Sequence, residues 1–110
     1  MPPADGMPPP LRFADLPRPD YAGGSLVNLM ASLIRSRGGR SPHRALAGLP
    51  PSALRPYSKV VLLLLDGLGA NQLHAFVTRG KGRQFFARHP WQIITTACPA
   101  TTAAVVTTLA

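Results

Sequence analysis

The chain has 110 residues, with 12 Lys and Arg against 4 Asp and no Glu, so its formal net charge is +8. Its single Cys excludes an internal disulfide framework, and its three His lack the spacing of a zinc finger. The longest apolar run, 60–65, has six residues, against roughly 18 needed to span a bilayer, so we expect no membrane partner. The N-terminus lacks the basic and apolar regions of a secretory signal, and the expected location is therefore the cytoplasm.

The first half of the chain predicts a Pro-rich lead, a helix and a surface connection. Residues 1–24 hold seven of the 13 prolines and favour an extended lead. The next segment, 25–58, opens with a helix between an N-cap at Ser25 and a stop at Gly38. Apolar residues at helical spacing predict that this helix docks through one face: Leu26, Leu29, Met30, Leu33 and Ile34. Turn residues then predict a connection with a short helix near Ser41.

The segment 59–110 contains the most informative pattern. Residues 60–65 are apolar at every position, which is typical of a strand covered on both faces in a parallel sheet. Asp66 follows directly, at the carboxyl end of the predicted strand, which is where binding sites assemble in parallel α/β sheets. An ionised carboxylate at the end of a buried strand needs a cation, a metal or N–H donors nearby. The alternative is that Asp66 merely caps the following helix, 70–78.

A second pattern lies near the C-terminus. Residues 91–96 are β-prone, Pro99 interrupts them, and 101–110 is a strand by propensity alone. The proline followed by hydroxyl residues and alanines is also compatible with a helix start, where small residues let a ligand approach. A Thr hydroxyl at a helix N-terminus either assists phosphate chemistry or simply caps the helix.

Together the two patterns resemble the opening of the alkaline phosphatase superfamily, and are most similar to its type I phosphodiesterase/nucleotide pyrophosphatase branch. The resemblance covers 17–110, and its motifs are Val-Val-Leu-Leu-Leu-Leu-Asp-Gly-Leu-Gly at 60–69 and Cys-Pro-Ala-Thr-Thr-Ala-Ala at 98–104. It implies the N-terminal part of a layered α/β/α fold with a mostly parallel central sheet, truncated, in which 59–110 begins the catalytic domain.

The resemblance also implies site residues and chemistry. Asp66 matches the family's first metal-binding aspartate, and Thr102 matches its threonine nucleophile, which also touches a metal; Thr101 takes this role if the motif is offset by one residue. The implied cofactors are two divalent ions, usually zinc, and the implied substrate is a phosphorylated small molecule or nucleotide. Family members are longer and carry their other ligands downstream. We therefore expect an N-terminal fragment, inactive alone, whose partner is the missing C-terminal part of its own fold.

Two other interpretations of the sequence remain. Gly67 and Gly69 after a strand resemble a dinucleotide-binding turn, but Gln72 stands where that motif needs a small residue. The alternative function is a small basic module that binds nucleic acid or phosphate without catalysis. The basic residues are scattered through connections with no helix-turn-helix signature, so no specific nucleic acid is expected. The three histidines are expected to be surface residues rather than ligands: His43, His74 and His89.

Overall fold

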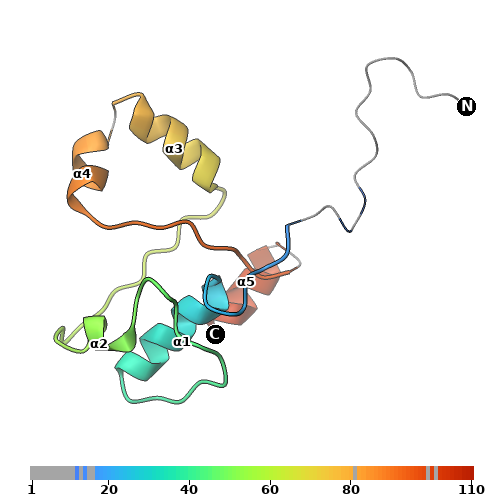
Figure 1. Ribbon diagram of the computed structural model, residues 1–110, viewed down its shortest axis with the longest axis vertical. Coiled ribbons are helices and arrows are strands. Elements are labelled where there is room, and N and C mark those ends of the chain that lie inside the picture. Colours follow the sequence, from blue (N-terminus) through green and yellow to red (C-terminus); the bar gives the residue numbers. More distant parts are fainter. Residues whose placement is uncertain (1–11, 13, 15–16, 81, 99, 101) are drawn as a thin grey trace, which may run out of the picture.

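The computed structural model describes residues 12, 14, 17–80, 82–98, 100 and 102–110, and this part of the chain is helical. Its helices are α1 (Leu26–Ser36), α2 (Pro51–Leu54), α3 (Ala70–Thr78), α4 (Arg83–Arg88) and α5 (Thr102–Leu109). Helix α1 contacts α2 and α5, while α3 and α4 contact each other and form a separate helical hairpin (Figure 1). Most of the expected lead, 1–24, lies outside the described residues.

The prediction of a mostly parallel central sheet is wrong for the described residues, which contain no strand. The stretch 60–65 runs between α2 and α3 without regular secondary structure (Figure 1), and a strand exists only where a neighbouring segment accepts and donates its backbone hydrogen bonds. No described segment lies in that position. The described residues pair in the manner of a sheet at one point, an isolated parallel bridge between Ser25 and Thr95. The layered α/β/α architecture is therefore not seen in this structure.

The helix predicted after Ser25 is confirmed, and its most deeply buried side is largely polar. Of the predicted apolar stripe, Leu26 is buried and Leu29, Met30 and Leu33 are half-buried. Asn28 is 0% exposed, and the buried side of α1 also includes Ala31, Ser32 and Ser36. Ile34, at the end of the stripe, is exposed. The polar side of the helix is buried because the connection after it folds back and uses those polar groups: the Leu46 N–H donates to Ser32 Oγ (2.8 Å).

Asn28 holds three parts of the chain together. Its Oδ1 accepts hydrogen bonds from the backbone N–H (3.1 Å) and hydroxyl (2.6 Å) of Ser25, which closes the start of α1. Its Nδ2 donates to the carbonyls of Tyr21 (2.9 Å) and Arg44 (2.9 Å), before and after the helix. The side-chain amide therefore makes four hydrogen bonds, its full capacity, which explains how a polar side chain is fully buried here.

The short helix in the connection begins at Pro51, not near Ser41 as the sequence predicts. Pro50 and Pro51 fix the backbone angles of its first turn. At its other end, the Arg37 guanidinium donates to the carbonyl oxygens of Leu54 (2.6 Å) and Tyr57 (2.8 Å). The Leu54 carbonyl also accepts from Tyr57 N (3.1 Å), so the Arg37 contact ties the end of this four-residue helix and the turn after it to α1.

We expect Arg37→Met to lower the free energy of unfolding by about 1 kcal/mol, because methionine keeps an apolar stem but cannot donate hydrogen bonds to these carbonyls. Urea unfolding followed by far-ultraviolet circular dichroism measures the change. Arg40→Met is the matched control, since Arg40 is exposed and the structure records no hydrogen bond from its side chain to the described residues. Equal effects of the two substitutions would contradict this role of Arg37.

Candidate functional site

Asp66 lies in the turn between the extended stretch 60–65 and helix α3. The helix predicted at 70–78 is confirmed, but its N-cap is Gly69, so Asp66 does not cap it. The Asp66 Oδ1 instead accepts a hydrogen bond from the Gly67 N–H (2.9 Å). Gly67 has φ +70°, a left-handed conformation that favours glycine, and this glycine turns the chain immediately after the carboxylate. The turn therefore uses one carboxylate oxygen and leaves Oδ2 for another partner.

Thr102 is the first residue of α5, and the structure therefore selects a helix over a strand for the C-terminal segment. A threonine in the first turn of a helix lies beside backbone N–H groups that have no partner within the helix. The next two residues, Ala103 and Ala104, are small. Pro99 and the competing nucleophile candidate Thr101 lie outside the described residues.

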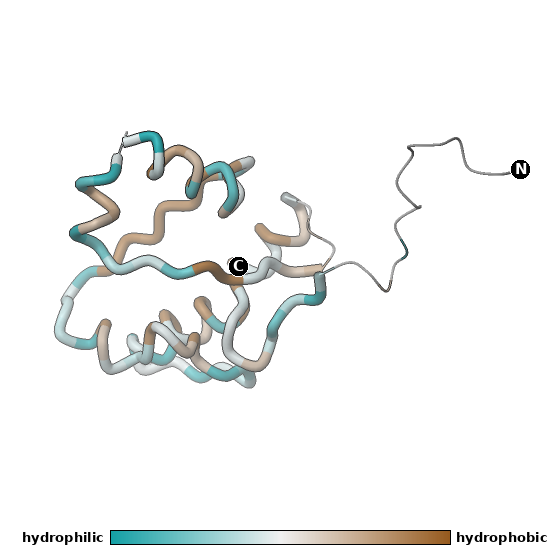
Figure 2. Tube along the Cα trace, turned by 45° about the horizontal axis from the view of Figure 1, so that its top comes forward, coloured by the Kyte–Doolittle hydropathy of each residue, from teal (hydrophilic) through white to brown (hydrophobic). Residues whose placement is uncertain are grey.

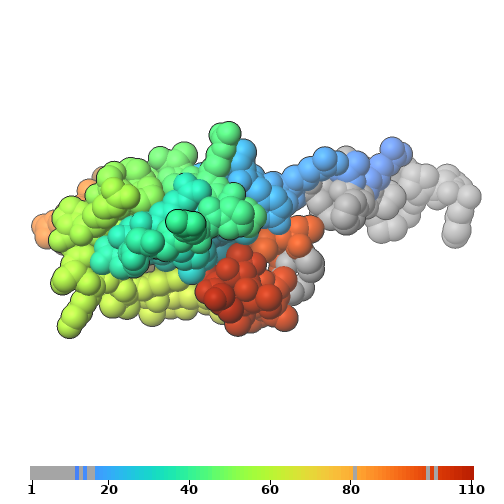
Figure 3. Space-filling view, turned by 90° about the horizontal axis from the view of Figure 1, so that it is seen from below, coloured from blue at the N-terminus to red at the C-terminus, as the bar shows by residue number. Residues whose placement is uncertain are grey.

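Helix α5 is positioned by contacts that cross most of the sequence. The Thr95 carbonyl accepts a hydrogen bond from Leu26 N (2.8 Å), and Thr95 N donates to the Gly24 carbonyl (2.8 Å). The Thr95 hydroxyl accepts from Asp20 N (2.7 Å). These bonds hold the segment before α5 against the start of α1, and Figure 3 shows α5 in red against α1 in cyan.

The two residues singled out by the sequence lie together. The Thr102 hydroxyl donates to Asp66 Oδ2 at 3.4 Å, although the residues are 36 positions apart. Both line an open cavity of about 570 Å³, whose wall also includes Leu64 and Leu65, the turn after Asp66, and residues of α1, α5 and the segment before α5. The two side chains are exposed to solvent. The pair is therefore accessible to a ligand that enters the cavity.

The separation of the two oxygens fits a pair of ligands on one zinc ion. Oxygens bound to tetrahedral zinc at roughly 2.0–2.2 Å lie about 3.3–3.6 Å apart, whereas two neighbouring ligands of octahedral magnesium lie about 2.9 Å apart. The observed 3.4 Å is also long for a hydroxyl–carboxylate hydrogen bond. A carboxylate and a hydroxyl supply two oxygen donors, which is half of a tetrahedral set. The described residues contain no cluster of three or more His, Cys, Asp or Glu that could hold an ion.

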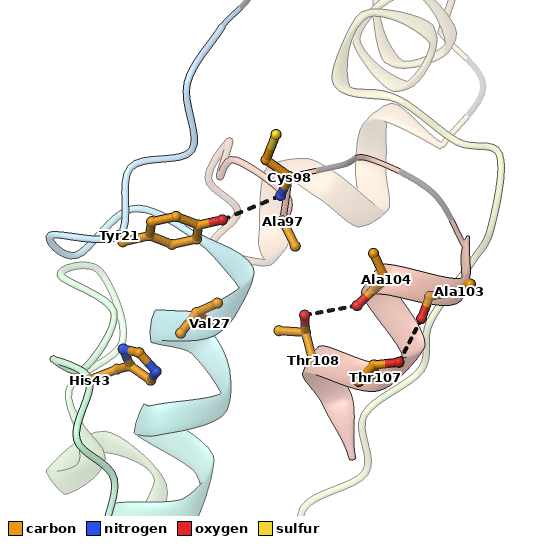
Figure 4. Close-up of a pocket in the computed structure, with 9 residues that line it drawn as sticks. All are labelled: Tyr21, Val27, His43, Ala97, Cys98, Ala103, Ala104, Thr107 and Thr108. Carbon is orange, nitrogen blue, oxygen red and sulfur yellow. Dashed lines mark hydrogen bonds between the residues drawn. The ribbon is translucent and has the colours of Figure 1, made fainter.

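A second cavity, of about 630 Å³, lies on the other side of α5 between that helix and α1 (Figure 4). Thr107 and Thr108 line it, but each hydroxyl donates its proton to a carbonyl of its own helix at 2.9 Å, so neither has a proton left to donate to a ligand. His43 and Cys98 also line this cavity, where Cys98 N donates to the Tyr21 hydroxyl (3.3 Å). The lining contains no carboxylate. The sequence did not predict this cavity, because it results from the packing of α1 against α5.

The contacts of the two other histidines, His74 and His89, do not bring them together in one site. The His89 ring stacks on Phe85 with centroids 4.2 Å apart, and its Nδ1 lies 2.7 Å from the Phe85 carbonyl oxygen. His74 lies on the exposed surface of α3.

Within the described part of the chain, no helix has the length and apolar character to cross a membrane. Comparisons with family models, curated proteins and solved structures gave no significant match.

Proposed function

We propose that this chain carries part of the active site of a metal-dependent hydrolase of phosphate esters or phosphodiesters, with Thr102 as the nucleophile and Asp66 as a metal ligand. The observation that supports the proposal is the 3.4 Å separation of the Thr102 hydroxyl and the Asp66 carboxylate. Two residues selected for this chemistry by their sequence motifs meet at the mouth of one cavity. The cytoplasmic location expected from the N-terminus is part of this proposal.

The chain's own residues would bind the phosphate and hold the nucleophile. The positive end of the helix dipole at the start of α5 favours an anionic phosphoryl group beside Thr102. The Thr102 hydroxyl directs its proton at Asp66 Oδ2. Asp66 and Thr102 would hold a divalent ion, and its positive charge would favour ionisation of the hydroxyl. The Thr102 oxygen would then attack phosphorus as the bond to the ester oxygen breaks, which would form a phosphothreonine and release an alcohol that takes up a proton from solvent.

The two zinc ions implied by the resemblance need more ligands than this pair provides. One ion accounts for Asp66 and Thr102, and the second has no ligand cluster among the described residues. The proposal assigns the remaining ligands to the C-terminal part of the fold that the resemblance implies. Its substrate is accordingly a phosphorylated small molecule or nucleotide, while the 110 residues alone supply the nucleophile and one carboxylate.

The alternative, a basic nucleic-acid-binding module without catalysis, receives less support from the structure. Two of its basic residues at the end of α1 already bind backbone carbonyls: Arg37 those of Leu54 and Tyr57, and Arg35 those of Ser41 (3.0 Å) and His43 (2.7 Å). Their guanidinium donors serve the fold rather than a phosphate backbone. Strongly salt-dependent binding of DNA or RNA without hydrolysis of phosphoesters would favour this alternative.

Asp66→Asn tests the metal-binding role in the product of the full open reading frame that contains this sequence. The substitution keeps the size of the side chain and removes the charge that offsets the cation, so zinc affinity should fall by at least about tenfold, and excess zinc should partly restore hydrolysis. Isothermal titration calorimetry with zinc measures the affinity. Asp20→Asn is the matched control, because that carboxylate accepts a local bond from Ala22 N (3.2 Å). Unchanged zinc affinity in Asp66→Asn would refute the assignment.

A further inference from the structure

The extended stretch 60–65 exposes six consecutive apolar side chains. It is yellow-green in Figure 1, where it leads from α2 toward the α3–α4 hairpin, and its residues form an apolar run in Figure 2. The exposure alternates as it does along a strand: Val61, Leu63 and Leu65 are 61–90% exposed, and Val60, Leu62 and Leu64 are 39–48% exposed. Contiguous exposed apolar surface of this kind marks an interaction site or an association-prone segment.

The backbone of this stretch is also without partners. Among the described residues, the structure records no backbone hydrogen bond to an N–H or carbonyl of 60–65. An extended segment with free N–H and carbonyl groups along its edges is a template for another extended chain. Neither edge of the stretch therefore has a backbone partner among the described residues, although Leu64 and Leu65 at its end line the cavity beside Asp66.

The charges at the two ends of the stretch indicate which segment pairs with it and in which direction. Lys59 precedes the six apolar residues and Asp66 follows them, with no charge between. When two copies pair antiparallel with Val60 opposite Leu65, Lys59 of each copy lies opposite Asp66 of the other. In a parallel, in-register pair the same residues would lie opposite themselves, with like charges facing each other, which is unfavourable. The stretch is therefore complementary to itself in the antiparallel direction.

From these observations we infer that 60–65 is a self-association site, at which a second copy of this chain pairs antiparallel through its own 60–65. In this register, each odd-numbered residue of one copy lies opposite an even-numbered residue of the other. Successive residues direct their backbone N–H and carbonyl groups to opposite edges of a strand, so the two copies contribute opposite edges to the contact. Such a contact is not closed by a two-fold axis, and each copy keeps one free edge for a further copy. The assembly is therefore open-ended and grows with concentration. The inference does not rest on the proposed hydrolase function.

Charge-reversed variants of the product of the full open reading frame that contains this sequence test the register. In Lys59→Glu, every contact opposes two carboxylates, and in Asp66→Lys, every contact opposes two ammonium groups. Each variant alone should need an about tenfold higher concentration to assemble than the wild type. An equimolar mixture of the two variants restores opposite charges at every contact and should assemble near the wild-type concentration. Sedimentation velocity and static light scattering in about 150 mM salt, where the net charge of the copies is largely screened, measure the assembly.

A second pair of variants separates this site from general apolar adhesion. Leu63→Lys places a charge in the middle of the stretch and should abolish assembly. Phe76→Lys removes another exposed apolar side chain, on α3, and should leave assembly unchanged. A wild-type chain that stays monomeric at all concentrations, or a mixture of the charge-reversed variants that assembles no better than either alone, would overturn the inference.

Discussion

Thr102→Ala, in the product of the full open reading frame, is expected to lower the rate of phosphoester hydrolysis roughly 10⁴- to 10⁶-fold, as removal of a covalent nucleophile does in other enzymes. Alanine keeps α5 helical and leaves Asp66 in place, so zinc should still bind. The phosphothreonine intermediate should disappear. Hydrolysis of p-nitrophenyl phosphate esters gives the rate, and trapping of labelled phosphate on the protein followed by mass spectrometry detects the intermediate.

The controls for Thr102 lie on the same helix and in the same motif. Thr107→Ala makes the identical change five residues on, where the hydroxyl donates only to the Ala103 carbonyl, and should leave the rate within a few-fold of wild type. Thr101→Ala tests the register of the motif: if it abolishes turnover while Thr102→Ala does not, the nucleophile is Thr101. Full activity of both variants would refute a threonine nucleophile. If the remaining ligands lie outside these 110 residues, as we propose, the 110-residue chain alone should show no turnover.

Asn28→Leu should produce the largest loss of stability, a fall of about 3 kcal/mol in the free energy of unfolding. The substitution places an apolar side chain among the Ser25 hydroxyl and the carbonyls of Tyr21 and Arg44, and burial of polar groups without partners costs about 1–3 kcal/mol each. Urea unfolding followed by circular dichroism measures the effect.

Two further variants identify the cause of that loss. Asn28→Asp keeps the shape and the acceptor for Ser25 but removes both N–H donors, so it should also destabilise the chain. Asn71→Leu makes the same amide-to-apolar change at an exposed position of α3 and should shift the free energy of unfolding by less than about 0.5 kcal/mol. A comparable loss in Asn71→Leu would show that Asn28 has no special role.

The sequence identifies elements whose signals are local. The helix after Ser25 could be predicted from its cap and its periodicity, and α3 from its position after the glycine turn. The buried face of α1 could not be predicted, because burial of Asn28 depends in part on the Arg44 carbonyl, which the connection contributes 16 residues further along the chain. Helix α4 has six residues and no apolar periodicity; Phe86 packs edge-on against Trp91 with centroids 6.4 Å apart, which is a contact outside the helix.

The failed sheet prediction has a similar cause. An apolar run such as 60–65 predicts an extended, association-prone segment, but its pattern does not specify the strand beside it. For the candidate site, the motifs indicated Asp66 and Thr102 as a pair. Their 3.4 Å separation depends on the backbone bonds between Thr95 and residues 24–26, and no spacing rule predicts a contact 71 residues apart in the chain.

The backbone hydrogen bonds between Thr95 and the start of α1 close the chain between them into a loop. The α3–α4 hairpin lies within this loop, and Gly80, with φ +90° and no neighbouring atom within 4 Å of where a Cβ would stand, lies at its turn. The entropy of closing a flexible loop grows only with the logarithm of its length, so doubling it costs about 0.6 kcal/mol. An insertion near Gly80 therefore lengthens the loop at little cost while its ends stay fixed. This turn is accordingly one place where the chain can grow longer without moving Asp20, Thr95 or the start of α1.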